Sequence, residues 1–204
     1  MLPAIILFAI STLPYALSYL TEKECGFQQQ AMERIGVTTY GICKVIATAV
    51  SAFLMGAASL WVFVGVLSTI GIPHTVRYDE VKNTYATLVI SMGPGWYYAA
   101  KALHMGLVCG QAALFSLMIT SWIPNAYVGF LSPLIGYYIA DCIYNLMGQL
   151  IISPLWHLFS PLLLFFDQPL PDIVFSYLWT VTLLVVLAVC FGIRFLLQLG
   201  KEHM

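Results

Sequence analysis

The chain has 204 residues, of which 61% are apolar and only 8% are charged, with a formal net charge of −1. A soluble domain carries about 25% charged residues, so this composition excludes an ordinary soluble protein and predicts a surface that faces lipid. The eight Lys and Arg residues against nine Asp and Glu cannot form the basic surface that would neutralise a phosphate backbone, which argues against nucleic acid as a partner.

Long apolar runs predict how often the chain crosses the bilayer. A helix needs about 20 apolar residues to cross about 30 Å of hydrocarbon, and lipid offers no partners for unpaired backbone groups. Five runs meet that length: 2–20, 45–71, 102–122, 126–149 and 173–199. We therefore predict an all-α polytopic protein of the cell membrane, with one transmembrane domain over residues 1–204.

The first run has two interpretations. Residues 2–20 contain no Lys or Arg and are longer than a typical signal-peptide core, which favours a retained span. The small residues of Ala16-Leu17-Ser18 resemble a cleavage site, so a removed signal peptide stays an alternative.

A polar segment, residues 21–44, follows the first run. Gly26 breaks the helix before it, and residues 27–35 (FQQQAMERI) are good helix formers. Three apolar residues share one face of that short helix: Phe27, Ala31 and Ile35. Three polar residues lie away from this face: Gln28, Gln29 and Glu33. The pattern predicts an amphipathic helix at the membrane interface.

Glycine and proline mark the later boundaries. Gly71-Ile72-Pro73 ends the second span, and an outer loop is predicted at 72–100, with a helix break at Gly93-Pro94-Gly95. Residues 122–125 make a tight turn between the third and fourth spans. Residues 151–173 are apolar but contain four prolines, each of which costs a helix interior about 3 kcal/mol. A re-entrant or interfacial pair of short helices is therefore expected there.

The Lys and Arg distribution predicts the orientation. With five spans, the 21–44 segment and the C-terminus share one side, which holds five basic residues: Lys23, Arg34, Lys44, Arg194 and Lys201. The other side holds three: Arg77, Lys82 and Lys101. The positive-inside rule places the first group in the cytoplasm. The N-terminus would then lie outside without a charged flank, so we expect a further helix upstream of Met1.

The pattern EKECG…ERIG…TYGICK resembles the first cytoplasmic loop of ABC-2 type permeases, the membrane-spanning subunits of ATP-binding cassette exporters. The residues in matching places are Glu22, Lys23, Glu24, Gly26, Arg34, Tyr40 and Lys44. The resemblance implies that this loop is a coupling helix docked on an ATP-binding cassette subunit. The coupling residues expected from it are Glu22, Glu24, Gly26, Gln29, Glu33, Arg34 and Lys44. The family's last outer loop is re-entrant, which suits 151–173, but its usual six spans exceed the five predicted here.

The resemblance implies a permease subunit that pairs with a second copy of itself or with a related permease. Export is the usual direction of transport in that family, so an exporter is expected. The sequence has no P-loop, so ATP would be bound by a separate subunit and no cofactor by this chain. The first alternative is a non-transporting small membrane scaffold or assembly protein whose charged loop only follows the positive-inside rule. The second is a membrane enzyme acting on lipid, suggested by His157 beside Trp156, but no catalytic or metal motif accompanies it.

Polar residues within the predicted spans mark a candidate path or subunit seam, since such residues are expensive in lipid. On the third span and its start these are Lys101, His104 and Gln111, and on the fourth they are Tyr138, Asp141, Asn145 and Gln149. The four on the fourth span are spaced by three or four residues and share one helix face. We expect Lys101 or His104 to meet Asp141 near the outer leaflet. A structural ion pair close to the interface is the alternative.

Overall fold

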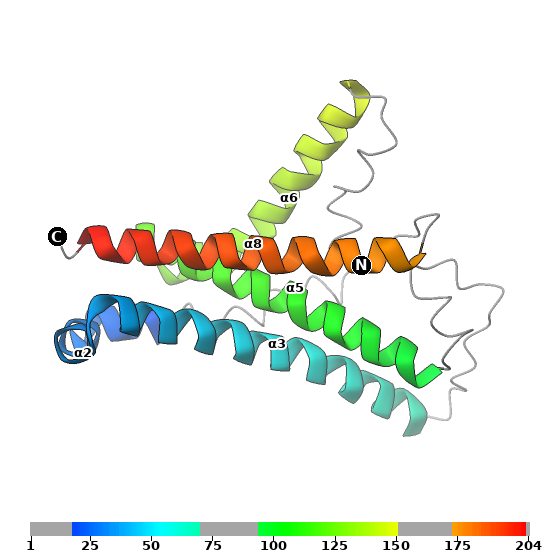
Figure 1. Ribbon diagram of the computed structural model, residues 1–204, viewed down its shortest axis with the longest axis horizontal. Coiled ribbons are helices and arrows are strands. Elements are labelled where there is room, and N and C mark those ends of the chain that lie inside the picture. The colour runs from blue at the N-terminus through cyan, green and yellow to red at the C-terminus, as the bar shows by residue number, and fades with distance from the viewer. Residues whose placement is uncertain (1–17, 70–93, 151–172, 203–204) are drawn as a thin grey trace.

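The computed structural model describes residues 18–69, 94–150 and 173–202. Residues 18–24 are helical, and five further helices follow in chain order among the described residues (Figure 1): α2 (Phe27–Ile35), α3 (Val37–Thr69), α5 (Pro94–Trp122), α6 (Ala126–Leu150) and α8 (Ile173–Glu202). The described residues contain no strand. The all-α prediction is therefore confirmed for this part of the chain.

Among the described residues, three helical segments are long and apolar enough to cross a membrane: Val37–Val66, Tyr98–Trp122 and Val181–Lys201. The apolar part of α6, Ala126–Ala140, is shorter. The length and composition of these segments are those of helices in a helical membrane protein. The predicted span at 2–20, apart from its last residues, and almost all of the predicted re-entrant segment at 151–173 lie outside the described residues.

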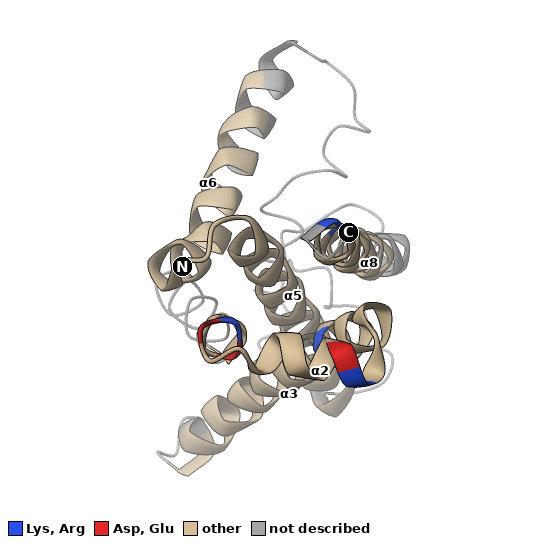
Figure 2. Ribbon diagram, turned by 90° about the vertical axis from the view of Figure 1, so that its left-hand side faces the viewer, with Lys and Arg blue, Asp and Glu red and all other residues tan. Residues whose placement is uncertain are grey.

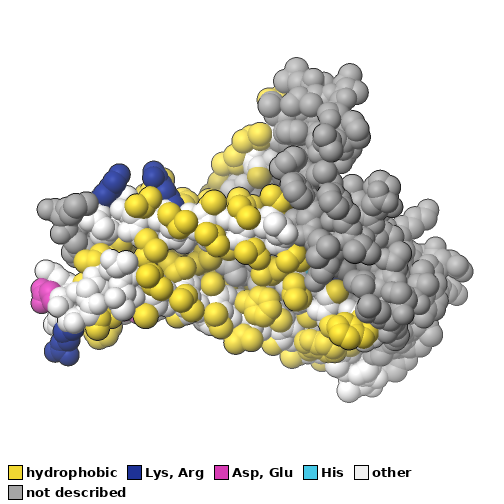
Figure 3. Space-filling model, viewed as in Figure 1, with side chains coloured by type: hydrophobic (Ala, Val, Ile, Leu, Met, Phe, Trp, Pro, Cys, Tyr) yellow, Lys and Arg dark blue, Asp and Glu magenta, His cyan; other side chains and the backbone are white. Residues whose placement is uncertain are grey.

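The arrangement places α5 at the centre, in contact with α3, α6 and α8. Within the apolar segments, 72% of the α5 residues are buried, against 11% for α3 and 17% for α8. Helices α3 and α8 therefore expose most of their apolar side chains, which cover the face seen in Figure 3. α6 contacts α5 and then points away from the other helices in both ribbon views (Figures 1 and 2).

Two helices begin earlier than predicted. α3 begins at Val37 and not near 45, so the predicted 21–44 loop is a helix end, the short α2 and the first turns of α3. Lys44 lies within α3, where its charge pairs with that of Glu22. α5 begins at Pro94 and not near 102, because a proline at the first helical position loses no helix hydrogen bond. Residues 94–100 of the predicted outer loop are therefore helical.

Small residues bring α3 and α5 into backbone contact. A Cβ atom added to Gly106 would lie 2.8 Å from the carbonyl oxygen of Phe53, and one added to Gly56 would lie 2.9 Å from that of Met105. Gly110, one turn after Gly106, faces the carbonyl of Ala49 in the same way. Lipid provides no hydrophobic drive between helices, so close packing at such small residues is what holds them together. We call this contact the glycine seam.

A proline within α6 explains a polar contact between α5 and α6. Pro133 has no N–H to donate to the carbonyl of Gly129 four residues earlier. That carbonyl instead accepts hydrogen bonds from the hydroxyls of Ser116 on α5 (2.6 Å) and Ser132 (3.0 Å). The start of α6 is capped by the Asn125 side chain, which accepts from the backbone N–H of Tyr127 at 2.9 Å. The tight turn predicted at 122–125 is therefore confirmed.

Candidate functional site

The short helix α2 has the bounds that the sequence predicted, because a glycine on each side reverses the chain. Gly26 precedes it with φ of 70° and Gly36 follows it with φ of 85°, both in the left-handed region that favours glycine. The N–H of Gly36 donates to the carbonyl of Met32 at 2.9 Å and closes the last turn. α2 is therefore a separate element placed across one end of the bundle (Figure 1).

The inner face of α2 rests on a cluster that joins the long helices. Met32 belongs to one buried cluster with Tyr19, Tyr40, Leu117, Phe195 and Leu199. These other members come from residues 18–24, from α3, from α5 and from α8. The rings of Tyr19 and Phe195 meet edge to face, with centroids 5.7 Å apart. We call this the Met32 cluster, and it links α2 to the packing of α3, α5 and α8.

The face of α2 predicted to be apolar packs on the protein only in part. Ala31 packs on the Met32 cluster, and Gln28 and Met32 are buried, whereas Phe27 and Ile35 are exposed. The spacing correctly predicted an amphipathic helix. It could not say which face meets protein, because an apolar side chain of a membrane protein can equally face lipid.

Four polar side chains tie the helical residues 18–24 to the start of α3. Lys44 Nζ donates to Glu22 Oε1 at 2.6 Å and to Ser18 Oγ at 3.1 Å. Ser18 Oγ donates to Glu22 Oε1 at 3.0 Å, and the Tyr40 hydroxyl donates to Glu22 Oε2 at 2.7 Å. We call these four residues the polar clamp. It closes the two sides of the α2 connection onto each other.

The environment of Glu22 favours its charged form. Partial burial raises the pKa of the carboxyl, but hydrogen bonds from Lys44, Tyr40 and Ser18, with the positive charge of Lys44, outweigh that effect and leave the pKa below its ordinary value. Glu22 is therefore ionised at neutral pH. The side chains of Lys44 and Glu22 are only 11% and 25% exposed, so this ion pair is screened less than a surface pair.

The structure brings together only two of the residues predicted to couple this chain to an ATPase, Glu22 and Lys44. Gly26 makes the turn into α2. The others stand exposed on or beside α2: Glu24, Gln29, Glu33 and Arg34. The acidic and basic residues of this region gather at one end of the bundle (Figure 2). Ser18 was missed by the sequence reasoning, although its spacing of four residues from Glu22 was a signal.

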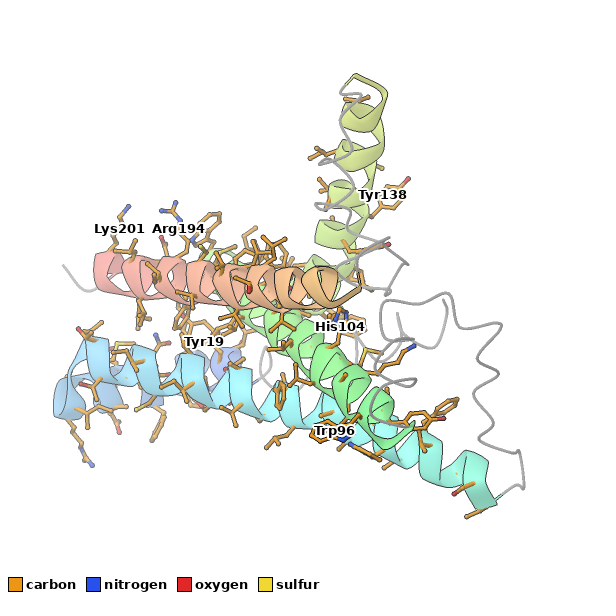
Figure 4. The ribbon with its side chains drawn as sticks, turned by 45° about the vertical axis from the view of Figure 1, so that its right-hand side comes forward. Tyr19, Trp96, His104, Tyr138, Arg194 and Lys201 are labelled. Atoms are coloured by element: carbon orange, nitrogen blue, oxygen red, sulfur yellow. The ribbon has the colours of Figure 1, made fainter. Side chains whose placement is uncertain are left out.

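The predicted path or seam residues are only partly brought together. His104 and Gln111 are buried on α5, Lys101 is half-buried, and Tyr138 is exposed on α6 and points away from the bundle (Figure 4). Three further residues lie on α6, and their side chains are outside the described part: Asp141, Asn145 and Gln149. The expected meeting of Lys101 or His104 with Asp141 stays a prediction.

α3 and α5 each carry a buried polar side chain near the glycine seam, and the sequence reasoning named only one of the two. Gln111 Oε1 and Thr48 Oγ1 are both buried without a hydrogen-bond partner among the described residues. Gly110 packs against Ala49, which puts Thr48 and Gln111 at the same level of the bundle. Thr48 was missed because a single threonine in an apolar run is typical of any membrane helix.

Among the described residues, no three His, Cys, Asp or Glu side chains gather in one place that could hold a metal ion. Comparison with known proteins adds no identity: no family model, no curated protein and no solved structure matches this chain.

Proposed function

We propose that this protein is the membrane-spanning permease subunit of an ATP-binding cassette exporter, driven by a separate ATPase subunit, with α2 as its coupling helix. One observation carries the proposal. A short helix with exposed polar residues lies across the charged end of a bundle of long apolar helices and rests on the Met32 cluster. The resemblance of residues 21–44 to the ABC-2 coupling loop supports the same function.

The contacts of α2 would let it pass a movement of the ATPase subunit on to the long helices. A push on its exposed side, where Glu33 and Arg34 stand, would press Met32 into the Met32 cluster, to which α3, α5 and α8 also contribute side chains. The polar clamp would make residues 18–24 and α3 move together, because the ion pair of Glu22 and Lys44 joins them, with Nζ and Oε1 2.6 Å apart. Packed cores respond to such a push by shifting whole helices and not by local deformation.

The proposal includes the partners and the finer architecture. The chain would work as a homodimer or with a related permease in the cell membrane, with two ATPase subunits on the cytoplasmic side of α2. It would have five spans and a re-entrant segment at 151–173, and it would perform no catalysis itself. The competing function is a small membrane scaffold, for which the same exposed apolar helices would only bind lipid and other membrane proteins.

Co-purification tests the proposal. The tagged chain is extracted from its native cells in mild detergent, and mass spectrometry identifies the proteins that accompany it. We expect an ATPase with a P-loop, and we expect Arg34→Glu to lose it, because Arg34 is exposed on α2. Lys201→Glu is the matched control, since it makes the same charge change at the end of α8.

Two results would favour the scaffold. One is a well-folded preparation of the unmodified chain that brings down no ATPase. The other is loss of the ATPase in Arg34→Glu and in Lys201→Glu alike, which would make the interaction a matter of net charge and not of α2.

A further inference from the structure

An apolar groove of about 380 Å³ lies between α5 and α6, on the side where α6 diverges. Its lining includes Phe115 and Ile119 of α5 and Tyr127, Leu131, Ile135 and Ile139 of α6. Ser132 also lines the groove, but its hydroxyl already donates a hydrogen bond to the carbonyl of Gly129. Such a volume is in the range of ligand sites, and its chemistry fits a hydrocarbon chain.

The groove leads to an aromatic residue at the charged end of the bundle. Phe115, Ile119 and Trp122 are spaced by four and three residues, so they form one stripe along α5. Phe115 also packs on Phe191 of α8, with ring centroids 5.2 Å apart. The stripe is therefore bordered by α6 on one side and α8 on the other, and Trp122 ends it at the depth typical of an interface tryptophan.

A fixed positive charge stands at that end. The guanidinium carbon of Arg194 lies 5.5 Å from the centre of the Trp122 ring, a cation–π contact that orients the side chain. Arg194 comes one turn after Phe191, so α8 places it on the side that borders the groove.

Lys201 extends the same surface. It lies seven residues after Arg194, and both side chains project the same way from α8, toward the side from which α6 rises (Figure 4). Neither forms an ion pair with a carboxylate of the described residues. Their charges are therefore available to an anion from outside the chain.

We propose that the groove and Arg194 bind one anionic phospholipid. One acyl chain lies along the α5–α6 groove, and the phosphate sits at the Arg194 guanidinium, whose planar donors match phosphate oxygens. Lys201 adds attraction for a negatively charged headgroup. The charge complementarity selects an anionic lipid over a zwitterionic one, which an apolar groove alone would not do. This site does not depend on the proposed transport function.

Native mass spectrometry of the detergent-purified chain tests the proposal, with phosphatidylglycerol and phosphatidylcholine of identical acyl chains as the probes. A basic residue near an anionic lipid strengthens binding roughly 5-fold. We therefore expect the unmodified chain to retain one phosphatidylglycerol at least about 5-fold more tightly than phosphatidylcholine, and Arg194→Gln to lose most of that preference. Arg34→Gln, which removes the same charge from α2, should keep it.

Ile135→Trp tests the groove separately, because it fills the acyl site without a change of charge. It should weaken retention of both lipids. Equal retention of the two lipids by the unmodified chain would overturn the proposal without any variant. Displacement of the bound lipid by inorganic phosphate, or equal losses in Arg194→Gln and Arg34→Gln, would also overturn it, because binding would then follow phosphate or net charge alone.

Discussion

The glycine seam and the charged end of the bundle hold helices together by opposite means. In the seam, α3 and α5 touch through Gly56, Gly106 and Gly110, and two buried polar atoms on these helices have no hydrogen-bond partner among the described residues. At the charged end, four polar side chains satisfy one another in the clamp. The seam is held by close contact, and the charged end by directional bonds that a partner or a change of pH can alter.

The largest expected effect is a break of the seam. Gly106→Ala places a Cβ atom 2.8 Å from the Phe53 carbonyl oxygen, a backbone atom that cannot move aside. We expect α3 and α5 to separate, with a loss of about 3 kcal/mol in the free energy of unfolding. Thermal unfolding in detergent measures this loss. Gly65→Ala is the matched control, because nothing lies within 4 Å of its added Cβ atom and alanine favours the helix.

A smaller effect is expected from the clamp. Glu22→Gln removes the charge that Lys44 pairs with but keeps an oxygen for Tyr40. The pair is intermediate between exposed pairs and fully buried ones, so we expect a loss of about 1–2 kcal/mol in the same unfolding measurement. The exposed Glu33 gives the control, since Glu33→Gln removes the same charge from the outer face of α2. A loss as large in Glu33→Gln would mean that the clamp has no special weight.

The contact between α5 and α6 combines close packing, as in the glycine seam, with a hydrogen bond between helices, as in the polar clamp. Ser116→Ala leaves the Gly129 carbonyl, which Pro133 already deprives of its helix partner, with only the Ser132 hydroxyl. We expect a loss of about 1 kcal/mol in stability. Ser59→Ala should be nearly neutral, because the Ser59 hydroxyl bonds only within its own helix. Equal effects of the two substitutions would contradict a role of Ser116 between helices.

The smallest expected effect is a pH dependence confined to the clamp. The pKa of Glu22 is lowered from its ordinary 4.5, so its stabilising contribution is fully present above pH 4.5 and is lost as pH falls through the lowered pKa. The stability gap between the unmodified chain and Glu22→Gln should therefore stay constant from pH 7 to about 5 and close only below 4.5. Closure of the gap between pH 7 and 5 would contradict the clamp geometry.

How much the sequence could predict differed between the same two regions. The bounds of α2 followed from Gly26 and the helix formers of 27–35, and the membrane class followed from composition. The sequence placed Lys44 at the end of a loop, and its ion pair with Glu22 was missed because spacing does not reveal a contact between separate helices. The packing partners in the glycine seam were missed for the same reason: Gly106 and Gly110 show a small-residue pattern, but the facing helix is known only from the fold.

The polar path residues show a second limit. Helical spacing placed Tyr138 on one face of α6 but could not reveal that this face lies away from α5. Helix direction in a membrane depends on packing against neighbouring helices, which the spacing of residues within one helix does not reveal.

The central claim is that the outer face of α2 meets a soluble ATPase, and site-specific photocrosslinking in the native membrane tests it most directly. A photoreactive residue at Gln29 or Glu33, both exposed on α2, should crosslink an ATP-binding protein. The same residue at Val62, exposed on the apolar face of α3, should crosslink none. Crosslinks to an ATPase from the α2 positions alone are the predicted result. An absence of such crosslinks from a folded chain, or equal crosslinks from Val62, would contradict the account.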